Sequence, residues 1–207
     1  MHREQTPNQG STGAPTSFAL GFPLRFARRR PVNPNVMRTR TYERSMNVEV
    51  RQAGEEEQNQ IEELLNDYLA ELSQHREICV GATSAAEYRY LKDYWSDSSR
   101  FPFTLWANSE LAGFAFVRRT EEDQAPVFQV AEFFVKPKYR RCGIGRASVT
   151  NIWQRFPGRW ELQVMNRNES AVQFWKRCIS QQARSWKVEE IVAPDGRRQF
   201  FHFEVAE

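Results

Sequence analysis

The residues best suited to chemistry lie in the stretch KYRRCGIGRAS, residues 138–148. Two glycines are separated by one isoleucine, and arginines flank them on both sides. The stretch follows an apolar run, VAEFFV, typical of a buried strand, and it precedes a segment with helical spacing. Backbone N–H groups between a strand and a helix favour an anion, and Arg140, Arg141 and Arg146 add positive charge. The loop is therefore expected to bind a phosphate or a pyrophosphate.

Known glycine-rich patterns explain this loop in different ways. A P-loop is excluded because no Gly-Lys-Ser/Thr sequence follows the glycines. The G-x-G-x-x-S sequence from Gly143 to Ser148, with Glu161 about 20 residues further on, is close to a dinucleotide-binding fingerprint. However, the segment from Lys136 to Cys142 separates the strand from the first glycine, whereas a Rossmann strand runs almost directly into its turn. A glycine-rich surface turn with incidental arginines is the simplest alternative.

A further explanation comes from the sequence R-x-x-G-x-G at 140–145. It follows FFVKPKY and precedes, at a suitable distance, the segment NESAVQFW at 168–175. With this lead-in and this following helix, the chain resembles the GNAT superfamily of acyl-CoA-dependent N-acyltransferases over about residues 46–205. In that family the loop wraps the pyrophosphate of coenzyme A through successive backbone amides. The resemblance implies acetyl-CoA as cosubstrate and no metal.

The resemblance also assigns coenzyme-binding roles to individual residues. Backbone groups of Phe134 and Val135 would pair with the pantetheine arm, in a slot at the end of the central strand. Arg140 would brace the loop, and residues 141–146 would hold the pyrophosphate. Asn168 would help to place the coenzyme, or it would only cap its own helix. The full expected set is Phe134, Val135, Arg140, Arg141, Cys142, Gly143, Ile144, Gly145, Arg146 and Asn168.

Glu132 is the candidate catalytic residue. Transfer of an acetyl group to an ammonium acceptor requires loss of a proton, so a base is needed. On a strict alternation, Glu132 shares a strand face with Phe128 and Phe134. Burial among apolar side chains is expected to raise the pKa of its carboxyl, which suits a base near neutral pH. The alternative is an ion pair with an arginine such as Arg118 or Arg119.

The sequence departs from the family pattern at the expected proton donor. Members usually have a tyrosine in the N-x-x-A-x-x-F-Y helix, where this chain has Trp175. An indole N–H donates hydrogen bonds but is not a useful acid, so Trp175 is expected to pack in the core. The departing thiolate would take a proton from water, from Tyr139, or from no group at all. Cys142 is interpreted as filling the loop, because the family generally transfers the acyl group directly.

The elements that must position these residues follow the order β-α-α-β-β-β-α-β-α-β-β. The first helix has apolar residues at helical spacing from Ile61 to Leu72, and 84–87 predicts a capping box that opens the second helix. Asn108 and Ser109 lie in a hairpin connection between two strands. This order predicts an α/β fold, with a mixed and mostly antiparallel sheet of about six to seven strands flanked by helices.

The first 45 residues differ in composition from the rest. Residues 1–45 carry eight arginines and two glutamates, in a chain whose net charge is +3. They are rich in Pro, Thr, Ser and Asn and are predicted not to fold alone. They are an extension upstream of a true start at Met46, an organelle transit peptide, or a basic arm that touches nucleic acid or an acidic surface. The predicted domain, 46–207, is mildly acidic, so nucleic acid is not its expected partner.

Cysteine use and hydropathy give expectations about location. The three cysteines are far apart and odd in number, so a reducing, cytoplasmic compartment is expected and a disulfide scaffold is not. No apolar run approaches the length of a membrane-spanning helix, so no membrane partner is expected. A homodimer is an open alternative to a monomer.

The predicted function is transfer of an acetyl group from acetyl-CoA directly to an amine. The acceptor would be a small-molecule or peptide amine, bound by the first two helices, their connection and the late hairpin. Tyrosines mixed there with Glu71, Glu77, Glu87 and Asp93 would suit a cationic amine, although helices packed on a sheet carry such residues anyway. The alternatives are an acyl-CoA-binding module with little or no catalysis and a dinucleotide-binding oxidoreductase.

Overall fold

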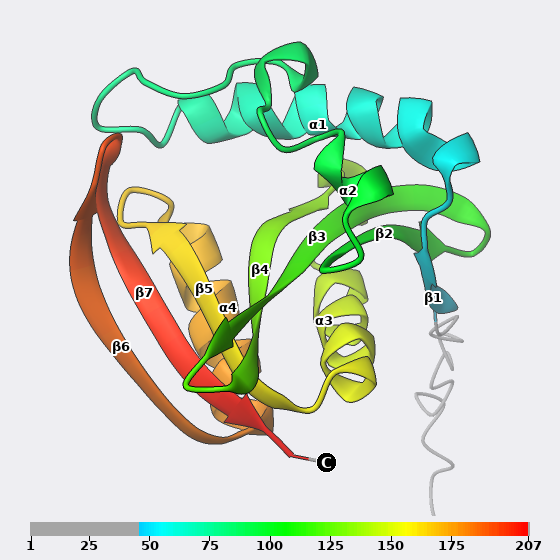
Figure 1. Cartoon of the computed structure of the whole chain (residues 1–207). Coiled ribbons are helices and arrows are strands. Elements are labelled where there is room, and N and C mark those ends of the chain that lie inside the picture. Colours follow the sequence, from blue (N-terminus) through cyan, green and yellow to red (C-terminus); the bar gives the residue numbers. More distant parts are fainter. Residues whose placement is uncertain (1–45, 207) are drawn as a thin grey trace, which may run out of the picture. The chain divides into compact units, whose positions relative to one another are not determined.

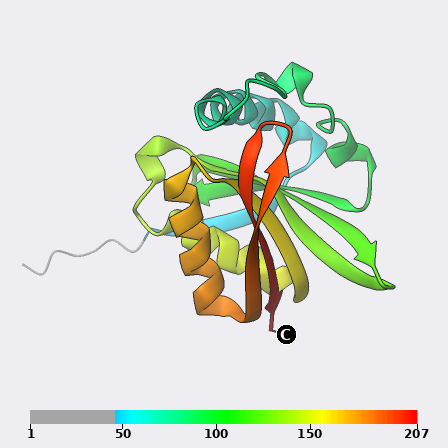
Figure 2. The same cartoon turned by 90° about the vertical axis from the view of Figure 1, so that its left-hand side faces the viewer.

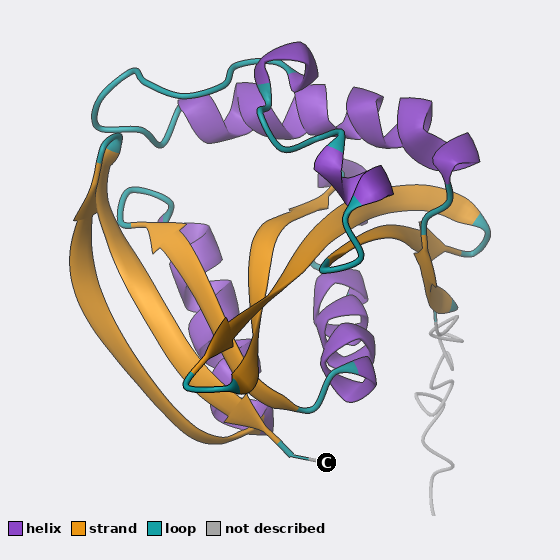
Figure 3. Cartoon of the chain, viewed as in Figure 1, coloured by secondary structure: helices purple, strands orange, loops and turns teal. Residues whose placement is uncertain are grey.

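The computed structural model describes residues 46–206, and the predicted basic extension, 1–45, lies outside these residues. Within them, the predicted order of elements is confirmed (Figure 1, Figure 3). Short 3-10 turns precede α1 (55–57), α2 (85–87) and α3 (137–139). The helices and strands are β1 (Val48–Gln52), α1 (Gln58–Ser73), α2 (Asp93–Ser96), β2 (Arg100–Ala107), β3 (Glu110–Glu122), β4 (Ala125–Val135), α3 (Ile144–Arg155), β5 (Gly158–Met165), α4 (Glu169–Gln182), β6 (Ala183–Ala193) and β7 (Gly196–Val205).

The strands form one seven-stranded sheet in the order β1-β2-β3-β4-β5-β7-β6. β4 and β5 are parallel, and the other neighbouring pairs are antiparallel, as predicted for a mixed sheet. α1 and α2 cover one face of the sheet, and α3 and α4 cover the other (Figure 1, Figure 2). Each face has its own core: Trp153 and Trp160 are buried on the α3 and α4 side, whereas Leu65 and Phe116 are buried on the α1 side.

Tight turns fix the register of the strands that carry the site. In the β2–β3 loop, Asn108 and Ser109 have φ angles of 49° and 67°. The β3–β4 loop has the same left-handed conformation at its two residues. Such two-residue turns match the twist of paired strands, so they hold the register without strain on the ladder. As a result, Glu132 on β4 lies opposite Phe116 on β3.

The second helix differs from its prediction. The sequence 84–87 predicts a capping box that opens one continuous helix, but it forms only a 3-10 turn, and a single helical turn, α2, follows later. Ser84 makes no side-chain capping bond. Tyr88 ends the 3-10 turn in an extended conformation, with ψ of 99°, and its hydroxyl reaches Glu132 on the sheet. This tertiary contact overrides the local helical pattern.

A β-bulge at Ala131 changes which side chains of β4 share a face. The pairing with β3 jumps from Val130 to Glu132, so Ala131 is the extra residue. One extra residue reverses the alternation beyond it. Phe128 packs in the core on the α3 and α4 side, whereas Phe134 packs in the core on the α1 side. Glu132 therefore shares a face with Phe134, as predicted, and the predicted shared face with Phe128 is wrong.

Cys79, Cys142 and Cys178 are all free, so no disulfide contributes to the fold. Burial raises the pKa of the Cys178 thiol to about 11, which leaves it protonated and unreactive at neutral pH. In the part of the chain that the structure describes, no helix combines the length and the hydrophobicity that crossing a membrane requires.

Candidate functional site

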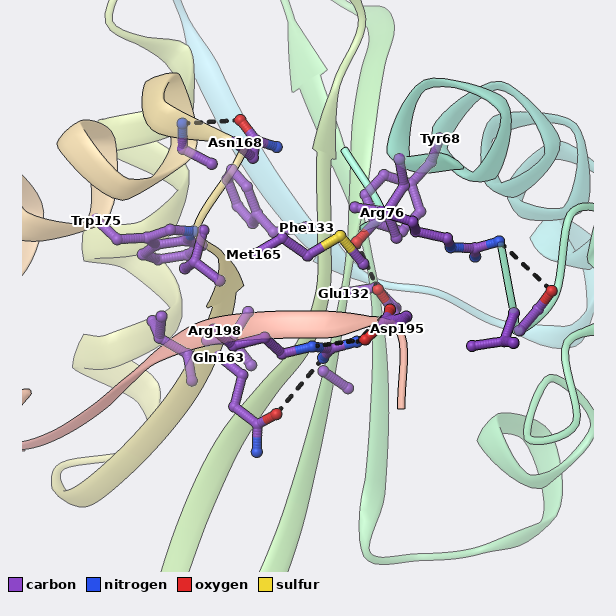
Figure 4. A pocket seen from close by; sticks show the side chains of 18 residues that line it. Tyr68, Arg76, Glu132, Phe133, Gln163, Met165, Asn168, Trp175, Asp195 and Arg198 are labelled. Atoms are coloured by element: carbon purple, nitrogen blue, oxygen red, sulfur yellow. Dashed lines mark hydrogen bonds and ion pairs between the residues drawn. The ribbon is translucent and has the colours of Figure 1, made fainter. Parts of the chain in front are cut away.

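A cavity opens where β4 and β5 stop pairing. Their parallel ladder ends at Val130 and Leu162, although both strands continue. The cavity beyond this point has a volume of about 250 Å³ (Figure 4). The predicted slot at the end of the central strand is therefore present. Its lining residues are Tyr68, Leu72, Arg76, Val80, Gly81, Val130, Ala131, Glu132, Phe133, Leu162, Gln163, Val164, Met165, Asn168, Ala171, Trp175, Asp195 and Arg198.

Backbone groups of β4 face this gap, although one of them is not the group predicted. The N–H of Lys136 donates to the carbonyl of Ala112 at 2.8 Å, which identifies a hydrogen-bonded pair of the β3–β4 ladder. Such pairs alternate along an antiparallel ladder, so the backbone of Phe134 also faces β3, whereas Phe133 and Val135 face the gap. The backbone of Phe134, one of the two predicted residues, is therefore engaged with β3. The backbone groups that face the gap are those of Phe133 and Val135.

The loop after β4 has the conformation that an anion site needs. Arg141 and Gly143 have left-handed φ angles of 64° and 82°, and open space lies where a Cβ of Gly143 would stand. None of the described residues accepts a hydrogen bond from the backbone N–H groups of 141–146. α3 begins at Ile144, so its positive dipole end adds to these free amides. The loop fits the diphosphate of an acyl-CoA.

Side-chain contacts hold the loop in place. Arg140 donates from Nε to the carbonyl of Val135 and from Nη2 to Glu71 of α1, each at 2.7 Å. Arg140 thus braces the loop between β4 and α1, as predicted. At Gly145, a Cβ would lie 3.2 Å from the ring of Phe174, so the glycine lets α3 pack closely against α4.

Asn168, at the start of α4, and Cys142, within the loop, are also predicted to contact the coenzyme. The side-chain oxygen of Asn168 accepts a hydrogen bond from the N–H of Ala171 at 3.1 Å, which confirms it as the N-cap of α4. Asn168 also lines the cavity, so its coenzyme role stays a prediction compatible with the cap (Figure 4). Cys142 is exposed, and its thiol donates to the carbonyl of Arg140 at 3.4 Å.

Glu132 borders the cavity between two tyrosine hydroxyls. Its Oε2 accepts a hydrogen bond from Tyr68 at 2.6 Å, and its Oε1 accepts one from Tyr88 at 2.9 Å. Burial raises the pKa of the Glu132 carboxyl above its ordinary value, although both hydrogen bonds act in the opposite direction. The predicted direction of this shift is confirmed. A carboxyl in this setting exchanges a proton closer to neutral pH than an exposed glutamate does.

The alternative ion pair of Glu132 is not formed in the described structure. Arg118 instead donates from Nε to the side-chain oxygen of Gln129, its cross-strand neighbour. Arg119 is exposed and lies opposite Phe128, on the other face of the sheet. Glu132 therefore keeps only hydroxyl partners, which leave it free to accept a proton.

Glu132 also borders a second cavity, of about 280 Å³. Glu132 and Arg198 line both cavities, whereas Tyr68 lines only the first and Tyr88 only the second. The carboxyl thus borders both spaces, and each space contains one of its two tyrosine partners. The second cavity is lined by Tyr88, Tyr90, Tyr94, Arg100, Arg118, Gln129, Val130, Ala131, Glu132, Gln163 and Arg198.

The residues considered for protonating a thiolate lie in different places. Trp175 is 6% exposed and packs against Phe133 and Phe174, with ring centroids 5.3 and 5.0 Å away. Its predicted role in the core is confirmed. The hydroxyl of Tyr139 donates to Glu110, and Tyr139 lines neither cavity. The structure therefore gives Tyr139 no access to the site.

Sequence reasoning missed the two tyrosines that hold Glu132. Tyr68 fits the apolar pattern of α1, and Tyr88 falls in a segment predicted to be helical. The pairs are 64 and 44 positions apart along the chain, so no local spacing links them. The sequence did contain one signal, the hydroxyl of Tyr68 within the otherwise apolar face of α1. A buried tyrosine hydroxyl usually has a hydrogen-bond partner, so a polar group facing it could have been expected.

The carboxylates expected to attract a cationic acceptor do not line either cavity. Glu71 is paired with Arg140, and Asp93 lies 3.7 Å from Arg100. Glu87 accepts hydrogen bonds within its own turn. Glu71, Glu87 and Asp93 are therefore engaged with other protein groups, and among the described residues the only carboxyl that lines the second cavity is Glu132.

Comparison with solved structures finds the same fold in several acetyltransferases. NAA60 of Arabidopsis thaliana, in complex with a bisubstrate analogue, has a TM-score of 0.54 at 11% identity, covering 77% of this chain and 98% of that one. Aminoglycoside acetyltransferase AAC(6')-Ib, in complex with coenzyme A, has a TM-score of 0.56 at 15% identity, covering 76% of this chain and 95% of that one. PaiA N-acetyltransferase of Thermoplasma acidophilum, in complex with coenzyme A, has a TM-score of 0.53 at 14% identity, covering 75% of this chain and 98% of that one. At these identities the likeness shows the fold alone.

The sequence itself identifies the family. A comparison with curated proteins found no match. The model of the acetyltransferase (GNAT) family, however, matches residues 61–178, more than half of the 207 residues. The matched range contains Glu132, the arginine-glycine loop and most of α4. The chain belongs to the acetyltransferase (GNAT) family.

Proposed function

We propose that this protein is an N-acetyltransferase that moves an acetyl group from acetyl-CoA directly to an amine. One observation carries the proposal: β4 parts from β5 beyond Val130, and the cavity there borders a carboxyl with a raised pKa. The loop that follows β4 in the chain presents free amides at 141–146. The free amides of 141–146 would hold the diphosphate, and the backbone of Phe133 and Val135 would hold the pantetheine arm. Acetyl-CoA, when bound, supplies the activated acetyl thioester.

Glu132 serves as the base in this proposal. An ammonium acceptor loses two protons in the overall reaction: one ends on the thiol of coenzyme A and the other in solvent. Glu132 accepts a proton from the acceptor nitrogen, directly or through the hydroxyl of Tyr88, which donates to it at 2.9 Å. The second cavity then holds the acceptor, and the first holds the coenzyme.

Tyr68 takes the role of the tyrosine that the family usually has in α4. Its hydroxyl donates to Glu132 at 2.6 Å and lies in the first cavity. Burial and the charge of Glu132 raise the pKa of Tyr68 well above its ordinary value. Once Glu132 is protonated, that charge is gone and Tyr68 is a better donor. Tyr68 then gives its proton to the departing sulfur and regains one from Glu132.

The tyrosines provide a test of these roles. Tyr68→Phe removes the donor on the coenzyme side, so kcat should fall by about 10- to 100-fold with little change in the KM for acetyl-CoA. Tyr88→Phe removes a hydroxyl from the same carboxylate on the acceptor side and serves as the matched control. Its larger effect should be on the KM for the amine. Equal kcat in Tyr68→Phe and the unmodified protein would contradict the assignment.

One alternative function has an observation in its favour. Trp175 stands where the family usually has its proton donor, which suits a module that binds acyl-CoA with little or no turnover. Thiol release from acetyl-CoA, measured with a panel of amines, distinguishes the two. Thermal shift with acetyl-CoA, and with NAD as control, tests binding separately, because a ligand of the native state raises Tm. Binding of acetyl-CoA without thiol release for any amine would favour the module.

A further inference from the structure

This inference rests on the proposed function and concerns the chemistry of the acceptor. The second cavity is lined by three arginines, Arg100, Arg118 and Arg198, and by one carboxyl, Glu132. The acidic residues that led to the expectation of a cationic acceptor are absent from its lining. The charged side chains facing this space are therefore mostly positive.

The three arginines differ in how far their charge is compensated. Arg198 is paired with Asp195, from Nη2 to Oδ2 at 2.7 Å. Arg100 lies 3.7 Å from Asp93 and 3.5 Å from Asp97, longer pairs in which both aspartates are about half exposed. Arg118 has only the uncharged Gln129 as a side-chain partner among the described residues. The uncompensated positive charge of the cavity therefore lies at Arg118.

Arg100 and Arg118 lie directly opposite each other in the β2–β3 ladder. Like charges in this position repel and destabilise a sheet. The side chain of Arg100 is only 12% exposed, so water screens this repulsion poorly. An anion between the two guanidinium groups would relieve the repulsion, which makes the pair the expected place for an acidic group of a ligand.

Two polar atoms of this cavity's lining residues are buried without a hydrogen-bond partner among the described residues. They are the hydroxyl of Tyr94, whose residue is 3% exposed, and Nε of Arg100, which lies 3.5 Å from Oδ2 of Asp97. Nε of Arg100 can only donate, and the hydroxyl of Tyr94 can donate as well as accept. An oxyanion of a ligand would give both groups an acceptor, which favours its binding here.

We propose that the acceptor is a small amine that carries a carboxylate, with the carboxylate bound between Arg100 and Arg118 and the amine directed toward Glu132. A carboxylate fits because guanidinium groups bind it through two parallel hydrogen bonds. A single negative charge also suits the site, since Asp93 and Asp97 already offset part of the charge of Arg100. Tyr88, Tyr90 and Tyr94 line the remaining wall and would contact the carbon skeleton.

The test uses pairs of amines that differ only in the acidic group. Glycine, β-alanine, 4-aminobutyrate, 6-aminohexanoate and L-phenylalanine are each compared with the corresponding primary amide, which has the same amine but no charge. Thiol release from acetyl-CoA should give kcat/KM at least about tenfold higher for one or more of the carboxylates than for its amide.

Matched variants locate the effect. Arg118→Gln should lower kcat/KM for the preferred carboxylate by about 10- to 100-fold and change it less than about threefold for the amide. Arg119→Gln is the control, because Arg119 is the next residue of β3 but is exposed on the opposite face. Arg119→Gln should leave kcat/KM unchanged for both the carboxylate and the amide. Equal loss for carboxylate and amide in Arg118→Gln would overturn the proposal, as would a general preference for the amides.

Failure of the acceptor proposal and failure of the proposed function give different results. Turnover of uncharged amines alone keeps the function and overturns the carboxylate site. If no amine releases thiol, the function fails, and the carboxylate site is then tested by calorimetry with the same amino acids in the presence of coenzyme A. Binding that Arg118→Gln abolishes and Arg119→Gln preserves supports the site. Absence of binding to the unmodified protein overturns it.

Discussion

The surroundings of Glu132 have opposite effects on its protonation. The carboxyl is surrounded by protein, which favours its protonated form, while the hydroxyls of Tyr68 and Tyr88 favour its charged form. Burial wins, so the folded-state pKa lies above the ordinary value of about 4.5. A fold that keeps such a group at the meeting point of two cavities accepts a loss of stability there, as sites of proton transfer often do.

The sign of this effect gives a prediction for Glu132→Gln. Above the ordinary pKa the unfolded chain has lost the proton while the folded chain still binds it, so stability falls as pH rises until the raised pKa is passed. Glutamine has no charge to bury. The free energy of unfolding of Glu132→Gln, relative to the unmodified protein, should therefore increase as the pH rises above about 4.5 and level off once the raised pKa of Glu132 is passed.

Urea unfolding of both proteins between pH 4 and pH 8 measures this difference, and the same variant should lose about 10²- to 10⁴-fold in kcat. Glu161→Gln offers a control carboxyl on the neighbouring strand that borders neither cavity. A stability difference that does not change with pH would contradict the raised pKa. Unchanged kcat would show that Glu132 is not the base.

At the scale of elements, the unusual backbone of the loop at 141–146 could be predicted from sequence, and the face of β4 on which Glu132 lies could be predicted only in part. Gly143 and Gly145 indicate positions where a side chain would not fit the backbone. Gly143 has a left-handed φ, and Gly145 lies where α3 packs closely against α4. The bulge at Ala131 has no such signal, because alanine fits both a regular strand and a bulge. This bulge decides on which face of the sheet the side chain of Glu132 lies.

The segment between α1 and β2 shows a second limit of sequence reasoning. Its pattern predicts a helix, and a helix would have placed Tyr88 according to local periodicity alone. Instead, Tyr88 leaves the 3-10 turn to reach Glu132, a contact that only the assembled sheet provides. For the same reason, the sequence did not predict that the second cavity is lined by more arginines than carboxylates.

Arg140 links the loop to β4 and to α1, and the consequence is testable. Arg140→Gln removes the contacts with the carbonyl of Val135 and with Glu71. The loop amides then lose their fixed arrangement, so the Kd for acetyl-CoA should rise by about tenfold, with kcat at saturating coenzyme reduced much less. Calorimetric titration with acetyl-CoA measures the change.

Two comparisons separate bracing from a direct charge effect of Arg140 on the coenzyme. Glu71→Gln keeps Arg140 and its contact with Val135 but removes the ion pair, so its Kd should lie between those of the unmodified protein and Arg140→Gln. Raising the salt concentration should weaken any direct charge effect and leave the loss due to bracing. An unchanged Kd in Arg140→Gln would contradict the bracing role.

At the scale of the whole described structure, β4 lies between the two cavities. Its open edge beyond Val130 borders the first cavity, and its Glu132 borders both. The first cavity is lined from both cores, by Tyr68 and Leu72 on the α1 side and by Leu162 and Trp175 on the α3 and α4 side. The two cavities share residues 130–132, Gln163 and Arg198, which is where the proposed direct transfer would take place.

The same view leads to a prediction about the length of chain that is needed. The buried core residues run from Val50 to Val205, and β1 pairs with β2 along Val48–Gln52. A chain that begins at Met46 should therefore keep the Tm of the full chain within about 2 °C and bind acetyl-CoA with the same Kd. Differential scanning calorimetry and titration of both chains measure these quantities.

A chain that begins at Ala53 is the informative control. It lacks β1, so it loses the buried side chain of Val50, 4% exposed, and the Val50 carbonyl that accepts a hydrogen bond from Arg155 of α3. Its Tm should fall by well over 5 °C, because β1 covers the edge of β2 and packs against α3. If the chain from Met46 loses as much stability as this control, then the first 45 residues contribute to the fold. If it keeps its Tm but loses affinity for acetyl-CoA, then the same residues contribute to the site.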